Sequence, residues 1–77
     1  MIVNGHPLIE VIPGVCGGRP VIRGTRMRVT DILGALAVGD TAEEILEDFP
    51  YIKREDIMAC LAYGAETSAQ PFAQAAE

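Results

Sequence analysis

The sequence has few of the residue types on which most catalytic and metal sites depend. It holds one histidine, His6, and two cysteines, Cys16 and Cys60, in 77 residues. One histidine and two distant cysteines do not provide the ligand spacing of a zinc site. We expect His6 to be an exposed loop residue and both thiols to be reduced. The chain is therefore predicted to hold no metal, to need no cofactor and not to be an enzyme.

Long hydrophobic runs are also lacking. The apolar segments near the N-terminus are interrupted by polar residues, glycine and proline, and none approaches the roughly 20 residues that a membrane-spanning helix needs. No signal peptide is recognisable either, which predicts a cytoplasmic protein without membrane contact. Hydrophobic residues nevertheless make up 49% of this short chain. Because small domains often make up for a small core by association, we expect a homodimer or an obligate partner.

Positive charge is scarce, and most of it lies in one place. The chain has six basic and eleven acidic residues, a net charge of −5. Residues 1–28 carry four arginines and one glutamate (+3), whereas residues 29–77 carry two basic and ten acidic residues (−8). The acidic part would repel a phosphate backbone, so the isolated chain is expected to bind DNA only weakly. The candidate sites for an anion or a protein partner are Arg19, Arg23, Arg26 and Arg28.

This arginine-rich stretch is predicted to form a β-hairpin over residues 20–29, after a short strand over residues 8–12. Gly24-Thr25 suits a type II′ turn, and counting outward pairs Ile22 with Met27 and Arg23 with Arg26. Alternation places Pro20, Ile22, Met27 and Val29 on an apolar inner face, and Val21, Arg23, Arg26 and Arg28 on the outer face. Like charges opposite each other repel, so we expect a partner, an internal carboxylate or solvent ions to offset the Arg23–Arg26 pair.

Three helices are predicted to follow the hairpin. The first covers residues 31–38, with Thr30 as N-cap and Gly39 as the residue after the C-cap. The second begins with a capping box between Thr41 and Glu44 and ends near residue 48. The third runs from residue 54 to about residue 66. Residues 1–66 thus form one small domain, with β elements in 8–29 and helices in 30–66, and residues 67–77 form a flexible tail.

The third predicted helix has two apolar stripes. The first stripe is Ile57, Cys60, Leu61 and Gly64, and the second is Met58, Ala62 and Ala65. A helix that is apolar around most of its girth is suited to a partner as well as to a core. We therefore identify Met58, Ala62 and Tyr63 as a candidate dimer or partner interface.

The second and third helices have the proportions of a helix-turn-helix, with Lys53 and Arg54 as candidate DNA contacts. The positions expected to be exposed on the third helix are Glu55, Ala59, Tyr63 and Glu66. Because two of these four are acidic, we interpret the helix pair as a packing unit rather than as a DNA reader.

Residues 17–66 resemble a small prokaryotic family called domain of unknown function 433. The resemblance is carried by separated markers in one order. These are Gly18, Pro20, the IRGTR block (22–26), Val29, the EEIL block (43–46), Pro50, the EDI block (55–57) and the LAY block (61–63).

The resemblance implies a mainly α fold, a homeodomain-like three-helix bundle with a short N-terminal β element, often dimeric. It also implies an antitoxin of a toxin–antitoxin system, whose partner is a PIN-like ribonuclease toxin. A row of arginines could neutralise the clustered carboxylates that hold metal in such a nuclease. The alternative is a transcriptional regulator that binds operator DNA through the helix-turn-helix.

Overall fold

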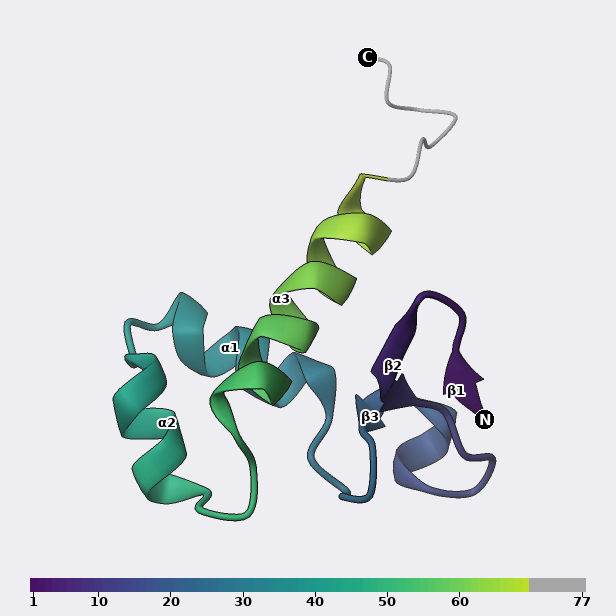
Figure 1. The fold of residues 1–77 in the computed structure, drawn as a ribbon, viewed down its shortest axis with the longest axis horizontal. Helices are drawn as coiled ribbons and strands as arrows, with labels where there is room; N and C mark the ends of the chain where they lie inside the picture. The colour runs from purple at the N-terminus through teal and green to yellow at the C-terminus, as the bar shows by residue number, and fades with distance from the viewer. Residues whose placement is uncertain (70–77) are drawn as a thin grey trace.

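The computed structural model describes residues 1–69, which form a small antiparallel sheet and three helices (Figure 1). The sheet has three strands in the order β1-β2-β3. The elements in chain order are β1 (Ile2–Val3), β2 (His6–Glu10), the 3-10 turn η1 (Cys16–Gly18), β3 (Val21–Ile22), α1 (Val29–Ala37), α2 (Ala42–Asp48) and α3 (Arg54–Ser68). The three helices and the β element after the N-terminus confirm the coarse prediction.

The N-terminal hairpin, β1 with β2, was not predicted. The strand expected over residues 8–12 begins earlier, at His6, and pairs with β1 through the register Val3↔His6. Asn4-Gly5 forms the turn, and Gly5 has a φ of +83°. Asn-Gly is a strong hairpin signal because both turn residues tolerate positive φ. The sequence therefore held the information for this hairpin, and the prediction missed it.

The second hairpin has the predicted register but a different turn. Val21 bridges Arg28, and the Ile22 amide donates to the Met27 carbonyl at 2.9 Å. The turn is closed by Thr25 N–H donating to the Ile22 carbonyl at 3.0 Å, which places Gly24 third with a φ of +79°. Positive φ at the third position defines a type II turn, so the predicted type II′ turn centred on Gly24-Thr25 is wrong.

The hydroxyl of Thr25 stabilises this turn. Thr25 Oγ1 donates to the Ile22 carbonyl at 2.8 Å and accepts from the Met27 amide at 2.9 Å. On its other edge β3 pairs with β2, through Ile9↔Ile22 and Glu10↔Val21. Strand β3 thus has β2 along one edge and the returning segment of its own hairpin along the other.

Helix α1 begins at Val29, two residues earlier than predicted, and Arg28 rather than Thr30 is its N-cap. The carboxylate of Asp31 accepts the Arg28 backbone N–H at 3.1 Å, which satisfies a donor that the start of a helix leaves free. The helix ends as expected before Gly39. Gly39 N–H donates to Leu36 and Asp40 N–H donates to Ala35, which together form a Schellman motif.

Helices α2 and α3 closely match the predicted segments. The capping box is present, with Glu44 N–H donating to Thr41 Oγ1 at 3.1 Å and Thr41 N–H donating to Glu44 Oε1 at 2.8 Å.

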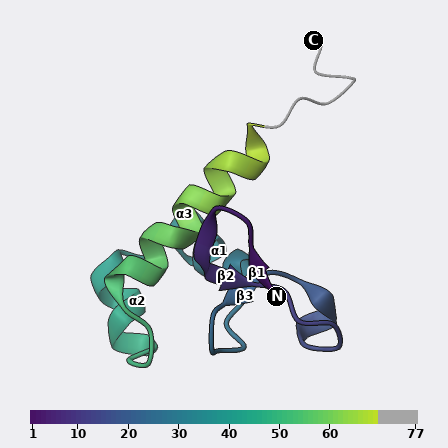
Figure 2. The same ribbon diagram turned by 45° about the vertical axis from the view of Figure 1, so that its right-hand side comes forward.

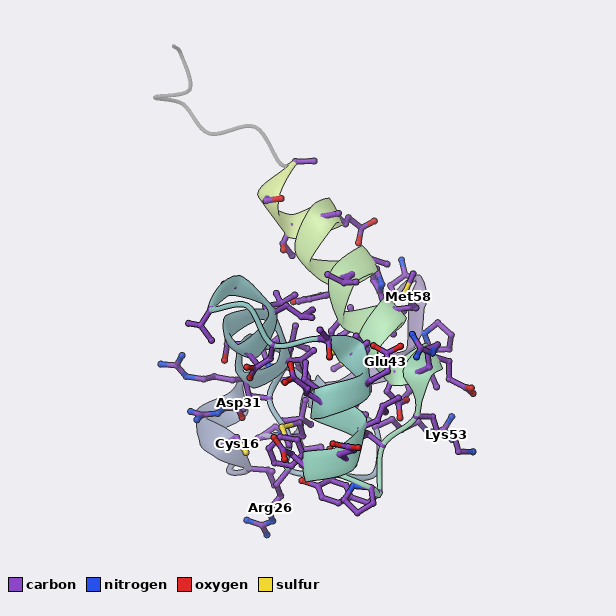
Figure 3. The ribbon with its side chains drawn as sticks, turned by 90° about the vertical axis from the view of Figure 1, so that its left-hand side faces the viewer. Cys16, Arg26, Asp31, Glu43, Lys53 and Met58 are labelled. Carbon is purple, nitrogen blue, oxygen red and sulfur yellow. The ribbon has the colours of Figure 1, made fainter. Side chains whose placement is uncertain are left out.

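Lys53, labelled in Figure 3, immediately precedes α3. The C-terminal part of α3 extends beyond the other elements in Figures 1 and 2. This helix continues to Ser68, and residues 70–77 of the predicted tail lie outside the described part of the chain.

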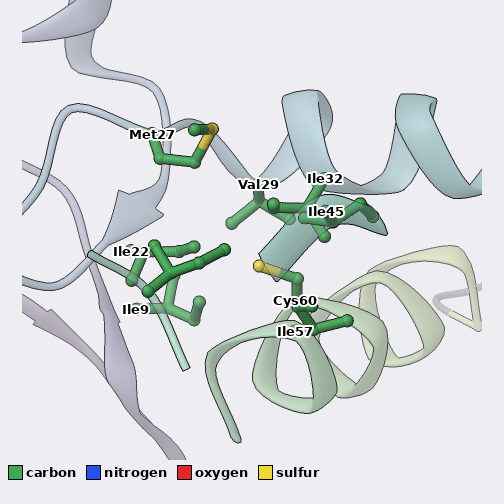
Figure 4. Close-up of a cluster of buried hydrophobic side chains, with 9 residues drawn as sticks. Ile9, Ile22, Met27, Val29, Ile32, Ile45, Ile57 and Cys60 are labelled. Carbon is green, nitrogen blue, oxygen red and sulfur yellow. The ribbon is translucent and has the colours of Figure 1, made fainter. Parts of the chain in front are cut away.

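The core lies between the sheet and the helices (Figure 4). Its buried members are Ile9, Ile22, Met27, Val29, Ile32, Ile45, Ile52, Ile57 and Cys60. Val21, which was predicted on the outer face, is fully buried. Ala59 and Tyr63 were predicted to be exposed but pack against this core. Helices α1 and α3 approach closely at Gly64, where a Cβ atom would lie 2.9 Å from Leu33 Cδ1.

Burial of Cys60 predicts a stability change at alkaline pH. The thiol is 0% exposed, and burial, together with the charge of Asp56, raises its pKa from 9.0 to about 11. Between these values the unfolded chain loses the proton first, so the free energy of unfolding falls as the pH rises, by about 2–3 kcal/mol. Urea unfolding from pH 8 to pH 11 should show this fall, and Cys60→Ala should flatten it. Parallel curves for the two proteins would contradict the assignment.

Candidate functional site: an exposed arginine rim

Three of the predicted arginines, Arg19, Arg23 and Arg26, are exposed, and we refer to these three together as the arginine rim. Arg19 follows η1, and the other two lie in and after the turn of the second hairpin. Ile22 and Met27 of the same hairpin are buried, so the turn is held by its inner face. Within residues 1–69 no carboxylate lies within 4 Å of the three guanidinium groups. The rim therefore presents positive charge that the described part of the protein does not neutralise.

Arg28 differs from the other three because it is tied to Asp31. Its Nε donates to Asp31 Oδ2 at 3.2 Å and its Nη2 donates to Asp31 Oδ1 at 3.1 Å. The hydrogen bonds and charge of Asp31 raise the pKa of Arg28 further. Both side chains remain exposed, but each satisfies the other. Arg28 thus belongs to the start of α1. The remaining candidates for binding an anion or a partner are the three arginines of the rim.

Glu10 is the other carboxylate near the hairpin, and it binds backbone rather than an arginine. Its Oε2 accepts the Gly24 N–H at 3.0 Å. This bond connects the strand β2 to the turn that carries Arg23 and Arg26. An internal carboxylate was one of the expected partners of the Arg23–Arg26 pair. Glu10 is such a carboxylate, but it accepts a hydrogen bond from the backbone of the turn instead.

A shallow, open depression of about 560 Å³ lies beside the rim. It is lined by Gly24, Thr25, Arg26, Met27, Asp31 and Tyr51. Arg26 points outward at this end of the molecule, on the same side of the view as Asp31 and Cys16 (Figure 3). Tyr51 lies in the connector between α2 and α3, is 61% exposed, and packs edge-to-face on Phe49 with ring centroids 6.2 Å apart. The sequence prediction did not include Tyr51, because only the packing of the connector brings it to the hairpin.

The candidate interface on α3 is only partly exposed. Met58, labelled in Figure 3, is 58% exposed. Leu61 is 41% exposed, and Ala62 is also at the surface. Tyr63 instead turns inward, with its ring edge-to-face against His6 at a centroid distance of 5.2 Å. The exposed apolar face of α3 is therefore Met58, Leu61 and Ala62, and Tyr63 belongs to the packing against β2.

The two candidate DNA contacts are in different situations. Arg54 Nη2 donates to Glu43 Oε2 at 2.8 Å, which connects α3 to α2. This hydrogen bond and the charge of Arg54 hold the pKa of Glu43 below its usual value. The Lys53 backbone N–H donates to Asp56, while its side chain is exposed. One of the two cations is thus already paired within the protein.

His6 is not the exposed loop residue that was predicted. It lies in β2, is 8% exposed, and its Nε2 is hydrogen-bonded to Glu66 Oε1. The bond connects the N-terminal hairpin to the far half of α3. The prediction was wrong because the partner lies 60 residues away in the sequence.

Comparison with known proteins assigns a family. Residues 9–64 match the family described as Protein of unknown function (DUF433). The chain belongs to this family. The DUF433 match contains every residue that lines the depression, whereas His6 and Glu66 lie outside it.

Two known proteins are similar to this DUF433 chain over most of its length. Uncharacterized protein y4eO of Sinorhizobium fredii (strain NBRC 101917 / NGR234) is 39% identical over 62 residues, covering 80% of this chain and 28% of that protein. The crystal structure of a DUF433 member protein from Anabaena variabilis ATCC 29413 is 33% identical, with a TM-score of 0.76. The match covers 79% of this chain and 60% of that one. This DUF433 chain therefore spans under a third of the first relative and under two thirds of the second.

No group of three His, Cys, Asp or Glu side chains within residues 1–69 is placed to hold a metal ion. Both cysteines are free, Cys16 half-buried and Cys60 fully buried. In the same part of the chain, no helix is long and apolar enough to cross a membrane.

The different roles of Asp31 and Arg26 can be separated by thermal unfolding. Asp31→Ala removes the acceptor of the Arg28 N–H at the start of α1 and should cost about 1 kcal/mol of unfolding free energy. Arg23→Ala and Arg26→Ala should stay within about 0.5 kcal/mol of the parent, since these side chains are exposed and have no ion-pair partner among residues 1–69. Equal losses in all three variants would show that the rim is part of the fold rather than a free surface.

Proposed function

We propose that this chain is a non-catalytic, antitoxin-like binding module that masks the acidic site of a PIN-like ribonuclease. The observation that carries the proposal is the rim, three exposed arginines without a carboxylate partner among residues 1–69. A guanidinium group binds a carboxylate through two parallel hydrogen bonds, which an ammonium group cannot do. Clustered carboxylates that hold metal in a nuclease would complement such a rim.

A binding role rather than catalysis is supported by the state of the reactive side chains. The single histidine is nearly buried and hydrogen-bonded to Glu66. The Cys60 thiol is buried, and its pKa of about 11 keeps it protonated at neutral pH. Neither group is positioned as an exposed base or nucleophile. The antitoxin role that the family resemblance implies, rather than any catalytic arrangement, therefore guides the proposal.

The proposal predicts inhibition of a nuclease through the rim. A PIN-like nuclease encoded next to this gene should cleave RNA alone and lose activity when this chain is added in equimolar amount. Arg23→Ala and Arg26→Ala should each weaken the complex by roughly 2–5 kcal/mol, because truncation leaves a desolvated carboxylate of the nuclease unpaired. Lysine at either position should restore only part of the affinity, since it keeps the charge but loses the fork. Calorimetric titration measures both effects.

Arg54→Ala is the matched control for this experiment. It removes the same charge, but Arg54 lies on α3 and is paired with Glu43. The control should bind the nuclease as the parent does. Absence of a neighbouring PIN-like gene, or a nuclease that keeps its activity in the presence of this chain, would refute the antitoxin proposal.

We also propose that the chain forms a homodimer through the exposed apolar face of α3. Met58, Leu61 and Ala62 would otherwise leave a patch of apolar surface in water. Light scattering at micromolar concentration should give twice the chain mass of 8.2 kDa. Met58→Glu should yield monomers, because it places two like charges in the contact. Val38→Glu changes an equally apolar residue that is 81% exposed at the end of α1, and it should leave the dimer intact. A parent protein that is a soluble, cooperatively folded monomer would exclude this dimer.

A second candidate is a regulator that binds operator DNA. It is favoured by the arrangement of α2 and α3, which are joined by a short connector as in the homeodomain-like, helix-turn-helix fold that the resemblance implies. The pairing of Arg54 with Glu43 and the acidic residues around it weigh against this role. Nanomolar, sequence-specific binding of duplex DNA by the isolated chain at physiological salt would favour the regulator over the antitoxin.

A further inference from the structure

We propose that the depression beside the rim is a binding site for a glutamate or aspartate side chain of an acidic peptide segment. Arg26 provides the guanidinium fork and Tyr51 the apolar wall. The inference rests on the proposed function, because it states which part of the rim anchors the partner and which chemistry the partner presents there. Its test uses a peptide and needs no nuclease.

The charges that line the depression favour an anionic occupant. Asp31 also lines it, but both carboxylate oxygens of Asp31 accept hydrogen bonds from Arg28. The negative charge of Asp31 is thus compensated by Arg28, outside the lining. Arg26 has no such partner in the described residues, although its backbone is held by Cys16 Sγ, which donates to the Arg26 carbonyl at 3.4 Å. The depression therefore carries one uncompensated positive charge on a fixed segment of backbone.

The apolar lining favours a side chain over a free inorganic anion. Tyr51 is largely exposed, while Met27 beneath the turn is nearly buried. A glutamate presents two methylene groups to such surfaces and its carboxylate to the guanidinium. Burial of methylene groups gains free energy that phosphate, which has none, cannot gain. An aromatic or aliphatic residue next to the glutamate would add contact with Tyr51.

The same lining argues against a nucleic-acid strand. Binding of a phosphate backbone depends on several cations that follow successive phosphates. The depression offers one free guanidinium and also contains a carboxylate, and the helical part of the chain that supplies Asp31 and Tyr51 is strongly acidic. A single carboxylate anchored between Arg26 and Tyr51 satisfies this arrangement better than a strand does.

Nuclear magnetic resonance of the ¹⁵N-labelled full chain tests the inference. The probes are the peptide acetyl-Glu-Glu-Phe-Glu-Glu-amide, its glutamine analogue, sodium phosphate and a 12-base-pair DNA duplex. The acidic peptide should shift the amide signals of Gly24, Thr25, Arg26, Met27, Asp31 and Tyr51. The glutamine peptide should shift them little, because it lacks the charge. Larger shifts of the same signals by DNA would assign the site to nucleic acid. Saturation by phosphate alone would assign it to a simple anion. Either result would overturn the inference.

Variants locate the binding within the depression. Arg26→Ala should weaken the acidic peptide about tenfold, the effect of losing one charge-assisted, bidentate pair. Tyr51→Ala should weaken peptide binding less than Arg26→Ala does. It should also reduce the affinity that the phenylalanine of the peptide contributes. Arg54→Ala removes the same charge from α3, where Arg54 pairs with Glu43, and should leave the affinity unchanged. Equal losses in Arg26→Ala and Arg54→Ala would show non-specific attraction and would overturn the site.

The outcome is independent of the nuclease experiment. Peptide binding in the depression without inhibition of any nuclease would retain this site and reject the antitoxin role. Inhibition of a nuclease that weakens in Arg23→Ala but does not change in Arg26→Ala or Tyr51→Ala would retain the antitoxin role and reject this site.

Discussion

The exposed surface of this protein depends on the burial of one short segment, Val21–Ile22. Both residues of β3 are almost completely shielded from water, with β2 on one edge and the returning chain at Arg28 on the other. The turn that follows β3 lies at the surface, where Arg23 and Arg26 are exposed. Unlike the predicted alternation, in which Val21 shared the outer face with the arginines, the structure buries both residues of β3 and leaves Arg23 and Arg26 exposed in and after the turn.

The same segment determines which arginines are free. Because Arg28 directly precedes α1, it lies where Asp31 can accept both its backbone N–H and its side chain. Local geometry thus pairs one arginine with the nearest acid. Glu10, the acid closest to the turn from the sheet side, is bound to the Gly24 amide. With both nearby carboxylates occupied by the fold, Arg23 and Arg26 have no partner from these two groups. The free charge of the rim follows from these hydrogen bonds rather than from a general excess of arginine.

The features that could be predicted from the sequence are those formed by residues close to one another in the chain. The capping box at Thr41 and Glu44, the Gly39 helix end and the Ile22–Met27 register all depend on neighbours within a few positions, and all are present. The Asn4-Gly5 turn was equally local and was overlooked. The His6–Glu66 bond and the position of Tyr51 beside Arg26 were beyond such reasoning, because tertiary packing brings distant segments together. Half of the candidate site, its guanidinium, was thus predictable, and its aromatic wall was not.

The N-terminal part that contains the hairpin and the helical part carry net charges of opposite sign. Arg23 and Arg26, which have no carboxylate partner within residues 1–69, lie in and after the turn. Most acids lie in the helical part, where Glu44 and Asp56 accept from backbone amides at the starts of α2 and α3. Acids at these positions are stabilised by the helix dipole as well as by hydrogen bonds, so the fold itself maintains the negative side. An acidic partner would be repelled by the helices and attracted only at the turn. The charge that makes the protein acidic overall therefore restricts the approach of such a partner to the rim.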